Sequence, residues 1–512
     1  MAQARSPDYD LLIIGGGING AGVARDAAGR GLTVLLCDKG DLGGATSAAS
    51  TKLIHGGLRY LEQYEFRLVR ESLLEREVLL KLAPHIIWPL RFILPHDKAQ
   101  RPSWLIRMGL FLYDQLGARQ RLPGSRAVDL RHDPVGRPLK ETLRRGFAYW
   151  DCWVQDNRLV VLNAMDAAAR GAEIRVRTAC VSARRENGLW HAELCGPAGT
   201  ETVTARGIVN AAGPWVGEAL AGVFDGASRP TLRLVKGSHI ITRRLFDHDA
   251  AYLFQNPDGR IIFAIPYERD FTLIGTTDVD VTGSPERPAI SEQEIDYLCR
   301  SASAWFAKPV TPETLVWSYA GVRPLHGGAA KGASAVSRDY YLQLDLPQGQ
   351  APLLNIFGGK LTTFRKLAEH VVDKIGPALG ATGPAWTETG PPLPGGDLAG
   401  ADPDQPAADL VARRPWLPAP LAQHLIRHYG SLSERLLGDA AALDQLGRDF
   451  GGGLYEAELA YAVQHEWVHT AEDFLWRRTK LGLRLSAEQR AAVEAWIAQR
   501  TGAVTAEPAA PG

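Results

Sequence analysis

The sequence predicts a mixed α/β (α+β) fold in which a nucleotide-binding unit is interleaved with an antiparallel-sheet lobe and followed by an all-helical domain. Three observations predict this architecture. Residues 8–38 show a strand, a glycine-rich turn, a helix and a second strand, residues 252–278 read as short strands separated by turns, and helical patterns follow residue 406. The 512 residues are enough for two or three domains of this kind.

The first element is a Rossmann-like nucleotide-binding unit. The apolar run at 11–14 is typical of a buried strand, and Gly15-x-Gly17-x-x-Gly20 follows it directly. Gly15 permits a tight turn, Gly17 lets the backbone approach a pyrophosphate, and Gly20 lets the following helix pack closely on the sheet. The positive end of that helix favours phosphate groups.

The second strand of this unit indicates which nucleotide it suits. Residues 33–37 form the strand, and Asp38 closes it. A carboxylate at this position accepts a hydrogen bond from a ribose 2′-hydroxyl, so the unit favours FAD or NAD over NADP. A glycine-rich turn in an ordinary α/β sheet is the alternative interpretation.

Two later segments favour FAD. Residues 206–216 contain a buried strand that ends in Ala211-Ala212-Gly213, which resembles the late strand that many FAD proteins return to their first nucleotide unit. Residues 353–370 repeat the arrangement of strand, Gly-Gly and helix, and the apolar positions of that helix form one stripe. A helix N-terminus suits a flavin ring, on which reduction places negative charge. Lys360 adds a cation there, unless it is a solvated loop lysine.

Composition excludes several classes of protein. Lys plus Arg total 57 and Asp plus Glu total 57, so no overall charge favours nucleic acid. The five cysteines have no CxxC spacing, which argues against zinc sites, iron–sulfur clusters and a disulfide framework, and we expect no metal. No signal peptide or membrane-spanning run is evident, so we expect a cytoplasmic protein that can still lie on a membrane.

Eight motifs together carry a family resemblance. They are GGGINGAG at 15–22, ATSAASTKLIHGGLRYLE at 45–62, DCWVQDNRLV at 151–160, NAAGPWV at 210–216, KGSHI at 236–240, GTTD at 275–278, GVRPL at 321–325 and FGGKLTTFRKLAEH at 357–370. They resemble the FAD-dependent (respiratory) glycerol-3-phosphate dehydrogenases, in the D-amino-acid-oxidase-like group, along nearly the whole chain. Departures lie at Gly43-Gly44 and in the HGGAAKG loop at 326–332.

The resemblance implies a cofactor, a reaction and a set of cofactor contacts. FAD would accept a hydride from sn-glycerol 3-phosphate, giving dihydroxyacetone phosphate, and the electrons would pass to a membrane quinone. The implied FAD contacts are Gly15, Gly17, Gly20, Asp38, Thr46, Ser47, Ala211, Gly213, Gly358, Gly359, Lys360, Leu361 and Thr362.

Anion recognition must be local in a chain without net charge. Lys52, His55 and Arg59 surround the pair Gly56-Gly57, where basic side chains beside flexible backbone suggest a pocket for an anion. A guanidinium binds phosphate through a bidentate fork. By the resemblance, the phosphate candidates are Arg59 and Arg323, with Tyr60 and Thr276 as neutral donors, and Lys360 is a further substrate-binding residue. We expect Arg323 in a Gly-x-Arg-Pro turn after a strand at 315–319.

Oxidation of an alcohol also requires a base for the hydroxyl proton. A neutral histidine suits this role because its ordinary pKa lies close to neutral pH. His239 is the first candidate and His55 the second, while Arg323 could polarise the substrate oxygen. A packed histidine that hydrogen-bonds to backbone is the alternative for each.

The predicted organisation is an FAD-dependent oxidoreductase domain at 1–385, a Pro/Gly-rich linker at 386–406, a helical domain at 407–505 and a disordered tail at 506–512. Residues 101–123 combine apolar side chains with arginines, as in a helix that lies among lipid headgroups. A core-packed helix with exposed arginines is the alternative. We expect peripheral attachment to the cytoplasmic face of the inner membrane, and a homodimer is possible.

Three other functions compete with the quinone-linked dehydrogenase. A glycerol-3-phosphate oxidase would pass electrons to oxygen, but such oxidases tend to carry an insertion for which this chain is short. A subunit of an anaerobic complex would add a cysteine-rich C-terminal segment, and no cysteine follows Cys299. A flavin-binding protein without turnover would not need the set Arg59, His239, Arg323 and Lys360.

Overall fold

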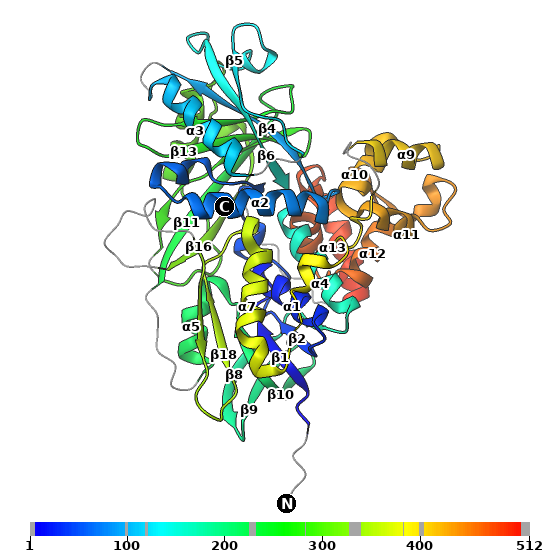
Figure 1. Ribbon diagram of the computed structural model, residues 1–512. Helices are drawn as coiled ribbons and strands as arrows, with labels where there is room; N and C mark the ends of the chain where they lie inside the picture. Colours follow the sequence, from blue (N-terminus) through cyan, green and yellow to red (C-terminus); the bar gives the residue numbers. More distant parts are fainter. Residues whose placement is uncertain are drawn as a thin grey trace, which may run out of the picture.

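Two sheets and a C-terminal domain of mostly helices make up the computed structural model (Figure 1). The structure describes residues 6–97, 101–117, 121–224, 232–281, 283–326, 339–381, 383–398 and 404–502. The HGGAAKG loop beyond His326 and the tail at 506–512 lie outside these residues. The predicted fold class is confirmed, because a nucleotide-type parallel sheet and a second, largely antiparallel sheet alternate along the chain.

The first sheet is built around the predicted nucleotide-binding unit. Its order is β17-β18-β10-β1-β2-β7, and all neighbours in it pair in parallel except β17 with β18. The bounds are β1 Tyr9–Ile14, β2 Val34–Cys37, β7 Glu173–Arg175, β8 Ala179–Glu186, β9 Leu189–Gly196, β10 Gly199–Asn210, β17 Tyr341–Asp345 and β18 Leu353–Phe357. A parallel strand is buried on both faces, which is why β1 reads as a continuous apolar run.

Helices cover both faces of this sheet. On one face α1 (Ile18–Gly29), α4 (Asp156–Ala169) and α7 (Phe364–Leu379) share a single apolar core with the strands, and Figure 1 shows them side by side. The predicted apolar stripe of α7 is fully buried in that core. On the other face, α5 (Val216–Gly222) packs with the β8–β9 hairpin.

The second sheet has ten strands in the order β15-β11-β14-β13-β12-β4-β6-β3, with β16 on β11 and β5 on β6. Its bounds are β3 Leu53–Ile54, β4 Ile87–His96, β5 Arg126–Asp129, β6 Arg145–Val154, β11 Leu232–Arg243, β12 Ala251–Gln255, β13 Ile261–Tyr267, β14 Phe271–Gly275, β15 Val279–Asp280 and β16 Leu315–His326. The pair β4–β12 is parallel, so the predicted antiparallel lobe is in fact mixed. The helices α2 (Phe66–Leu82), α3 (Ser103–Leu116) and α6 (Glu292–Ser303) belong to this lobe.

The prediction that Arg323 lies in a turn is wrong. The strand β16 continues to His326, and Arg323 pairs with Val235 of β11. Gly321 and Pro324 looked like turn residues, which they often are. Within the described residues β16 pairs with β11 alone, and the edge of a sheet tolerates a proline that cannot donate to the ladder.

The C-terminal domain is helical apart from one small hairpin. Its elements are α9 Gln405–Arg413, α10 Ala419–Tyr429, α11 Ser433–Leu437, β19 Asp449–Gly451, β20 Leu454–Tyr455, α12 Glu456–His465, a π-helix Asp473–Arg478 and α13 Ala487–Thr501. The stretch predicted as a linker begins with α8 (Trp386–Thr389), and Leu393 within it is buried. The domain boundaries themselves stay predictions.

Buried ion pairs fasten this domain to the first sheet. Arg158 of α4 lies 2.5 Å from Glu466, and both side chains are almost completely buried. Arg478 pairs with Asp41, which follows β2, at 2.6 Å. Breaking a buried pair by removing one partner typically costs about 3–5 kcal/mol, so these contacts hold the domain firmly in place.

The close approach of α1 to the turn after β1 gives a stability prediction. A Cβ added at Gly20 would lie 1.9 Å from the carbonyl oxygen of Gly15. Gly20→Ala should therefore lower the free energy of unfolding by about 1–3 kcal/mol, as measured by urea denaturation.

Gly217→Ala is the matched control, because the nearest atom to its added Cβ is Leu232 Cδ1 at 3.7 Å and it lies inside α5. This variant should keep or slightly raise stability. Equal unfolding midpoints for Gly20→Ala, Gly217→Ala and the unaltered chain would contradict the packing argument.

Candidate active site

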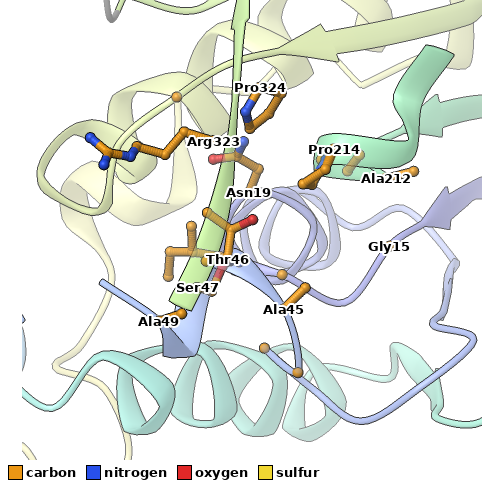
Figure 2. A pocket seen from close by; sticks show the side chains of 18 of the residues that line it. Gly15, Asn19, Ala45, Thr46, Ser47, Ala49, Ala212, Pro214, Arg323 and Pro324 are labelled. Atoms are coloured by element: carbon orange, nitrogen blue, oxygen red, sulfur yellow. Dashed lines mark hydrogen bonds between the residues drawn. The ribbon is translucent and has the colours of Figure 1, made fainter. Parts of the chain in front are cut away.

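Loops at the carboxyl ends of β1, β2, β10 and β18 surround one cavity of about 740 Å³. Ligands of open α/β sheets bind at this edge. Strands β11 and β16 of the second sheet close the opposite side, where His239 and Arg323 line the cavity. Figure 2 shows the loops converging, with Thr46 and Ser47 between the turn at Gly15 and the strand that carries Arg323.

The turn after β1 matches the predicted fingerprint. Gly15 has a φ of +110°, and an added Cβ would lie 2.5 Å from the carbonyl oxygen of Ala211, so only glycine fits. Gly17 lines the cavity, and a Cβ there would meet only Ser47 Oγ at 3.3 Å. Gly20 is not among the lining residues that the structure describes, and it instead packs behind the turn.

Asp38 ends β2 and lines the cavity. Its Oδ2 accepts a hydrogen bond from the N–H of Gly16 at 2.6 Å, and its Oδ1 accepts one from Gly40 at 2.7 Å. Burial raises the pKa of Asp38, while these two backbone donors act in the opposite direction. A carboxylate offers about four acceptor positions, so capacity remains for a ribose hydroxyl.

Thr46 and Ser47 tie the loop after β2 to both sheets. Thr46 Oγ1 donates to the carbonyl oxygen of Val322 on β16 at 2.6 Å. Ser47 Oγ accepts from the N–H of Ile18 at 3.0 Å, which satisfies one of the donors that α1 leaves unpaired at its N-terminus. Both residues line the cavity, and their predicted contacts with FAD stay predictions.

The remaining predicted cofactor contacts also line the cavity: Ala211, Gly213, Gly358, Gly359, Lys360, Leu361 and Thr362. Gly358 and Gly359 both have positive φ, so they turn the chain sharply between β18 and α7. Asn19 Nδ2 donates to the carbonyl oxygen of Gly358 at 3.0 Å, which joins this turn to α1.

His239 lies on β11 and faces the cavity. Its ring stacks on Tyr319 of β16, with 4.7 Å between centroids, and a Cβ at Gly275 of β14 would lie 2.1 Å from its Cδ2. The glycine therefore makes room for the imidazole. His239 Nε2 lies 2.9 Å from Thr51 Oγ1, whereas Nδ1 is buried without a hydrogen-bond partner in the described part of the chain.

The surroundings of His239 keep its ring neutral. Burial lowers its pKa well below the ordinary value, and the charges of Lys52 and Arg323 lower it further. A neutral imidazole at neutral pH can accept a proton.

Arg323 lies over Gly237, in the same sheet as His239. Its Nη2 donates to the carbonyl oxygen of Thr277 at 3.0 Å, and its Nη1 lies 3.2 Å from Asp278 Oδ1. A Cβ at Gly237 would lie 2.1 Å from Nη2 and 2.7 Å from Thr276 Oγ1, so this glycine leaves space for both side chains. In Figure 2 the guanidinium extends away from Gly15, at the far end of the cavity from the nucleotide fingerprint.

A second cation stands near the cavity. Lys360 Nζ lies 4.2 Å from the centre of the Tyr60 ring, and both residues line the cavity together with His55. The N–H of His55 donates to Thr362 Oγ1 at 3.2 Å. Arg59 is half-buried and is not among the described lining residues, so its predicted contact with phosphate stays a prediction.

Lys52 does not belong to an anion pocket, contrary to the sequence interpretation. The side chain is fully buried, and its Nζ lies 2.8 Å from Asp156 Oδ2. A lysine close to a glycine pair suggests an accessible side chain, but the ion pair with a carboxylate of α4 has no signal in the local sequence.

Comparison with known proteins identifies the family. The family described as FAD dependent oxidoreductase matches residues 10–364, and the C-terminal domain of alpha-glycerophosphate oxidase matches residues 389–502. The chain belongs to the FAD-dependent oxidoreductase family. FAD is thus its cofactor, as predicted from the fingerprint and the two later segments.

Three similar proteins show how much of the chain the likeness covers. The aerobic glycerol-3-phosphate dehydrogenase of Escherichia coli (strain K12) is 52% identical over 96% of this chain and 98% of its own. The D-erythritol 1-phosphate dehydrogenase of Brucella abortus (strain 2308) is also 52% identical, over 97% and 99%. The crystal structure of the glycerol-3-phosphate dehydrogenase from Bacillus halodurans complexed with FAD has a TM-score of 0.75 at 28% identity, over 96% and 91%. The predicted family resemblance is confirmed.

The cavity fits FAD. Asn19 Oδ1 and Trp215 Nε1 line it, and among the described residues both are buried polar atoms without a hydrogen-bond partner. Buried polar groups are normally satisfied, so these two atoms indicate a ligand. Gly15, Gly17 and Asp38, which the fingerprint assigns to a pyrophosphate and a ribose, all line this cavity.

Sequence reasoning missed several charged residues that line the FAD cavity. Arg177 follows β7 with a φ of +53°, and Arg477 comes from the C-terminal domain; both pair with Asp473. Lys39 lies 4.3 Å from the centre of the Trp215 ring. Only Lys39 had a local signal, since it directly follows Asp38.

Gly17→Val should abolish FAD binding without unfolding the protein. The new Cβ meets only Ser47 Oγ at 3.3 Å, so the branched side chain projects into the space that the pyrophosphate needs. The FAD content of the purified variant, read from its visible flavin absorbance, should be close to zero while its melting temperature in the apo form matches that of the unaltered apo protein.

Gly222→Val supplies the control, because nothing lies within 4 Å of a Cβ at that position. It should bind FAD normally. A Gly17→Val protein with full flavin content would show that the pyrophosphate does not pass this turn.

Proposed function

We propose that this protein oxidises sn-glycerol 3-phosphate to dihydroxyacetone phosphate by hydride transfer to FAD, with the electrons passing to a membrane quinone. The observation that carries the proposal is the convergence of His239, Arg323, Thr276 and Lys360 on the cavity whose other end is the dinucleotide fingerprint. Relatives that align along almost the whole chain are named glycerol-3-phosphate dehydrogenases, which supports the same substrate.

The residues at the substrate end suit an alcohol that bears a phosphate. FAD, when bound, supplies the acceptor for the hydride. Arg323 and Lys360 provide cationic donors for the phosphate, and Thr276 Oγ1 lies beside the guanidinium as a neutral donor. Each charge-assisted hydrogen bond contributes about 1.5–3 kcal/mol.

We assign the proton-accepting role to His239. As the carbinol C–H leaves as hydride, the O–H bond breaks, its proton passes to the neutral imidazole, and the C=O bond forms. His239 suits this step because it is neutral and faces the cavity beside Arg323. The second candidate, His55, stays a prediction.

One observation favours a second substrate. The relative named D-erythritol 1-phosphate dehydrogenase is as similar to this chain as the relative named aerobic glycerol-3-phosphate dehydrogenase. A longer polyol phosphate carries the same phosphate and a secondary alcohol, so the same cations and the same base would serve it. The second candidate function is therefore oxidation of a tetritol phosphate.

Anaerobic reduction of the bound flavin tests the substrate assignment. Glycerol 3-phosphate should bleach the visible absorbance of the purified yellow protein within its turnover time, and D-erythritol 1-phosphate should bleach it more slowly. The rate constants from stopped-flow absorbance decide between the two. Faster bleaching by the tetritol phosphate would favour the second candidate, and no bleaching by either would refute the proposal.

Arg323→Ala provides the matching variant. Loss of a bidentate guanidinium should lower kcat/KM by about a hundredfold or more while FAD content stays unchanged.

Rapid peroxide formation in air by the unaltered enzyme, with slow quinone reduction, would instead identify an oxidase.

The proposed membrane contact is supported by helix α3. Trp104, Met108, Phe111 and Leu112 are exposed by 66, 47, 57 and 40% of their surface, and of the whole helix only Leu110 and Tyr113 are buried. Such a face is typical of a helix that lies at a lipid surface. None of the helices in the described ranges has both the length and the apolarity to cross a bilayer.

This apolar helix lies close to the FAD cavity. Tyr113 of α3 accepts a hydrogen bond from the N–H of Gly56 at 2.8 Å, and the neighbouring His55 lines the cavity. A quinone dissolved in the bilayer would thereby come near the flavin. We infer peripheral attachment to the cytoplasmic face of the inner membrane through this helix.

Trp104→Glu/Phe111→Glu should separate membrane binding from chemistry. Two charges on the apolar face should reduce binding to anionic lipid vesicles by tenfold or more, and the reduction of quinone in those vesicles should fall with it. Reduction of a soluble dye should be unchanged. Co-sedimentation and the two assays measure these effects.

Val316→Glu/Leu346→Glu is the control, because both side chains are exposed and apolar but lie outside α3. It should bind vesicles as the unaltered protein does. Equal binding by both double variants would remove α3 from the membrane surface.

A further inference from the structure

Lys52 is a buried lysine in the loop that crosses from the first sheet to the second. Its backbone has a φ of +59°, a conformation that costs a non-glycine residue about 1 kcal/mol or more. Its side chain is fully buried and ion-paired with Asp156 at 2.8 Å. Desolvation of the charge and the positive φ both cost free energy of folding. A residue that keeps both features is expected to have a specific role.

Asp156 fastens this loop to the N-terminus of α4. Its Oδ2 accepts hydrogen bonds from Ser50 Oγ at 2.8 Å and Lys52 Nζ at 2.8 Å, and the N–H of Ser50 lies 3.3 Å from it. Lys52 Nζ also donates to the carbonyl oxygen of Ala48 at 3.1 Å. The loop at 48–52 is therefore held from both of its ends by one ion pair.

The same loop carries the contacts of His239. Thr51 stands between Ser50 and Lys52, and its Oγ1 lies 2.9 Å from His239 Nε2. Tyr319, on which the imidazole stacks, donates its hydroxyl to the carbonyl oxygen of Ser50 at 2.7 Å. Lys52 Nζ lies 5.0 Å from the centre of that Tyr319 ring. The imidazole of His239 is thus positioned by the Thr51 hydroxyl and by the Tyr319 ring, and the positions of both depend on the loop at 48–52.

Several charged groups from other parts of the chain act on His239 or on Lys480 near this loop. Lys52 and Arg323 both disfavour a proton on His239. Lys480, from the C-terminal domain, is buried; burial first and then the charge of Lys52 lower its pKa to about 7, while Asp156 and Glu268 act in the opposite direction. The charge of Lys52 therefore lowers the pKa of both His239 and Lys480.

We propose that Lys52 and Asp156 form a positioning pair, which fixes the hydroxyl of Thr51 against His239 and places a buried cation beside its ring. Neither Lys52 nor Asp156 is among the described residues that line the cavity. The pair acts through His239, and so the proposal rests on the proposed role of that residue as the proton acceptor.

The test is the pH dependence of flavin reduction in Lys52→Met, with Lys52→Arg as the conservative variant. Loss of the cation should raise the acid limb of kcat/KM by about one pH unit, because a neutral neighbour no longer disfavours protonation of His239. It should lower kcat by tenfold or more, with a smaller change in KM. Lys52→Arg should restore the position of the limb.

A second readout needs no substrate. In holoenzyme labelled at the histidine Cε1 carbons, NMR follows the protonation of His239, whose signal is assigned by its loss in His239→Gln. The pH at which this signal moves from the neutral to the protonated position should be about one unit higher in Lys52→Met than in the unaltered protein and in Lys52→Arg.

Arg158→Met is the control for a general loss of stability. It breaks another buried ion pair that begins on α4, with Glu466, and should lower the melting temperature without moving the acid limb or the His239 signal. If Lys52→Met does not fold, Lys52→Met/Asp156→Asn removes the cation without leaving a charged, unpaired Asp156, and should shift the limb in the same direction by a smaller amount.

The proposal is overturned if Lys52→Met, or the double variant in its place, has the same pH profile and the same His239 signal as the unaltered protein. The pair would then be purely structural. A failure of the proposed function looks different, because then no polyol phosphate reduces the flavin of the unaltered enzyme, whereas the NMR comparison still reports on the pair.

Discussion

The loop from Asp38 to His55 leaves the parallel sheet, lines the cavity and enters the second lobe at β3, and only its stretches at 41–43 and 52–54 are buried. Contacts with side chains and with a backbone carbonyl of other elements hold it along this path. Asp41, Thr46 and Asp156 supply the anchors, through Arg478, the carbonyl oxygen of Val322 and Lys52 respectively. Asp38, Thr46, Ser47 and Thr51 of this loop all line the cavity.

These anchors explain why so many charges are buried here. An unpaired buried charge would cost several kcal/mol, so each carboxylate must bring its cation. The pairs span long distances in sequence: Asp41 meets Arg478, and Lys52 meets Asp156. A hydrophobic contact could stabilise the loop equally well, but it would not fix the direction of a hydroxyl such as Thr51 toward His239. Ionic anchoring therefore gives the site geometry in addition to stability.

Local patterns predicted the nucleotide end of the site better than the substrate end. The fingerprint from β1 to Asp38 is encoded in consecutive residues, because a tight turn, a helix N-terminus and a buried strand each have their own sequence signal. The position of Arg323 was mispredicted, since Gly321 and Pro324 suggest a turn and only the pairing with β11 shows a strand. Lys52 was misread for the same reason: its partner on α4 lies about a hundred residues away, beyond any local pattern.

The C-terminal domain belongs to the same constraint. Arg477 lines the FAD cavity, Arg478 holds Asp41, and Trp476 lies 4.7 Å from Trp317 of β16 between ring centroids. The short segment around the π-helix thus reaches the loop and the strand that carries Arg323 at once. Because Asp41 is almost fully buried, separating this domain would leave its charge without a partner. The C-terminal domain therefore supplies both a residue that lines the FAD cavity and an anchor for its loop, although the oxidoreductase family match ends at residue 364.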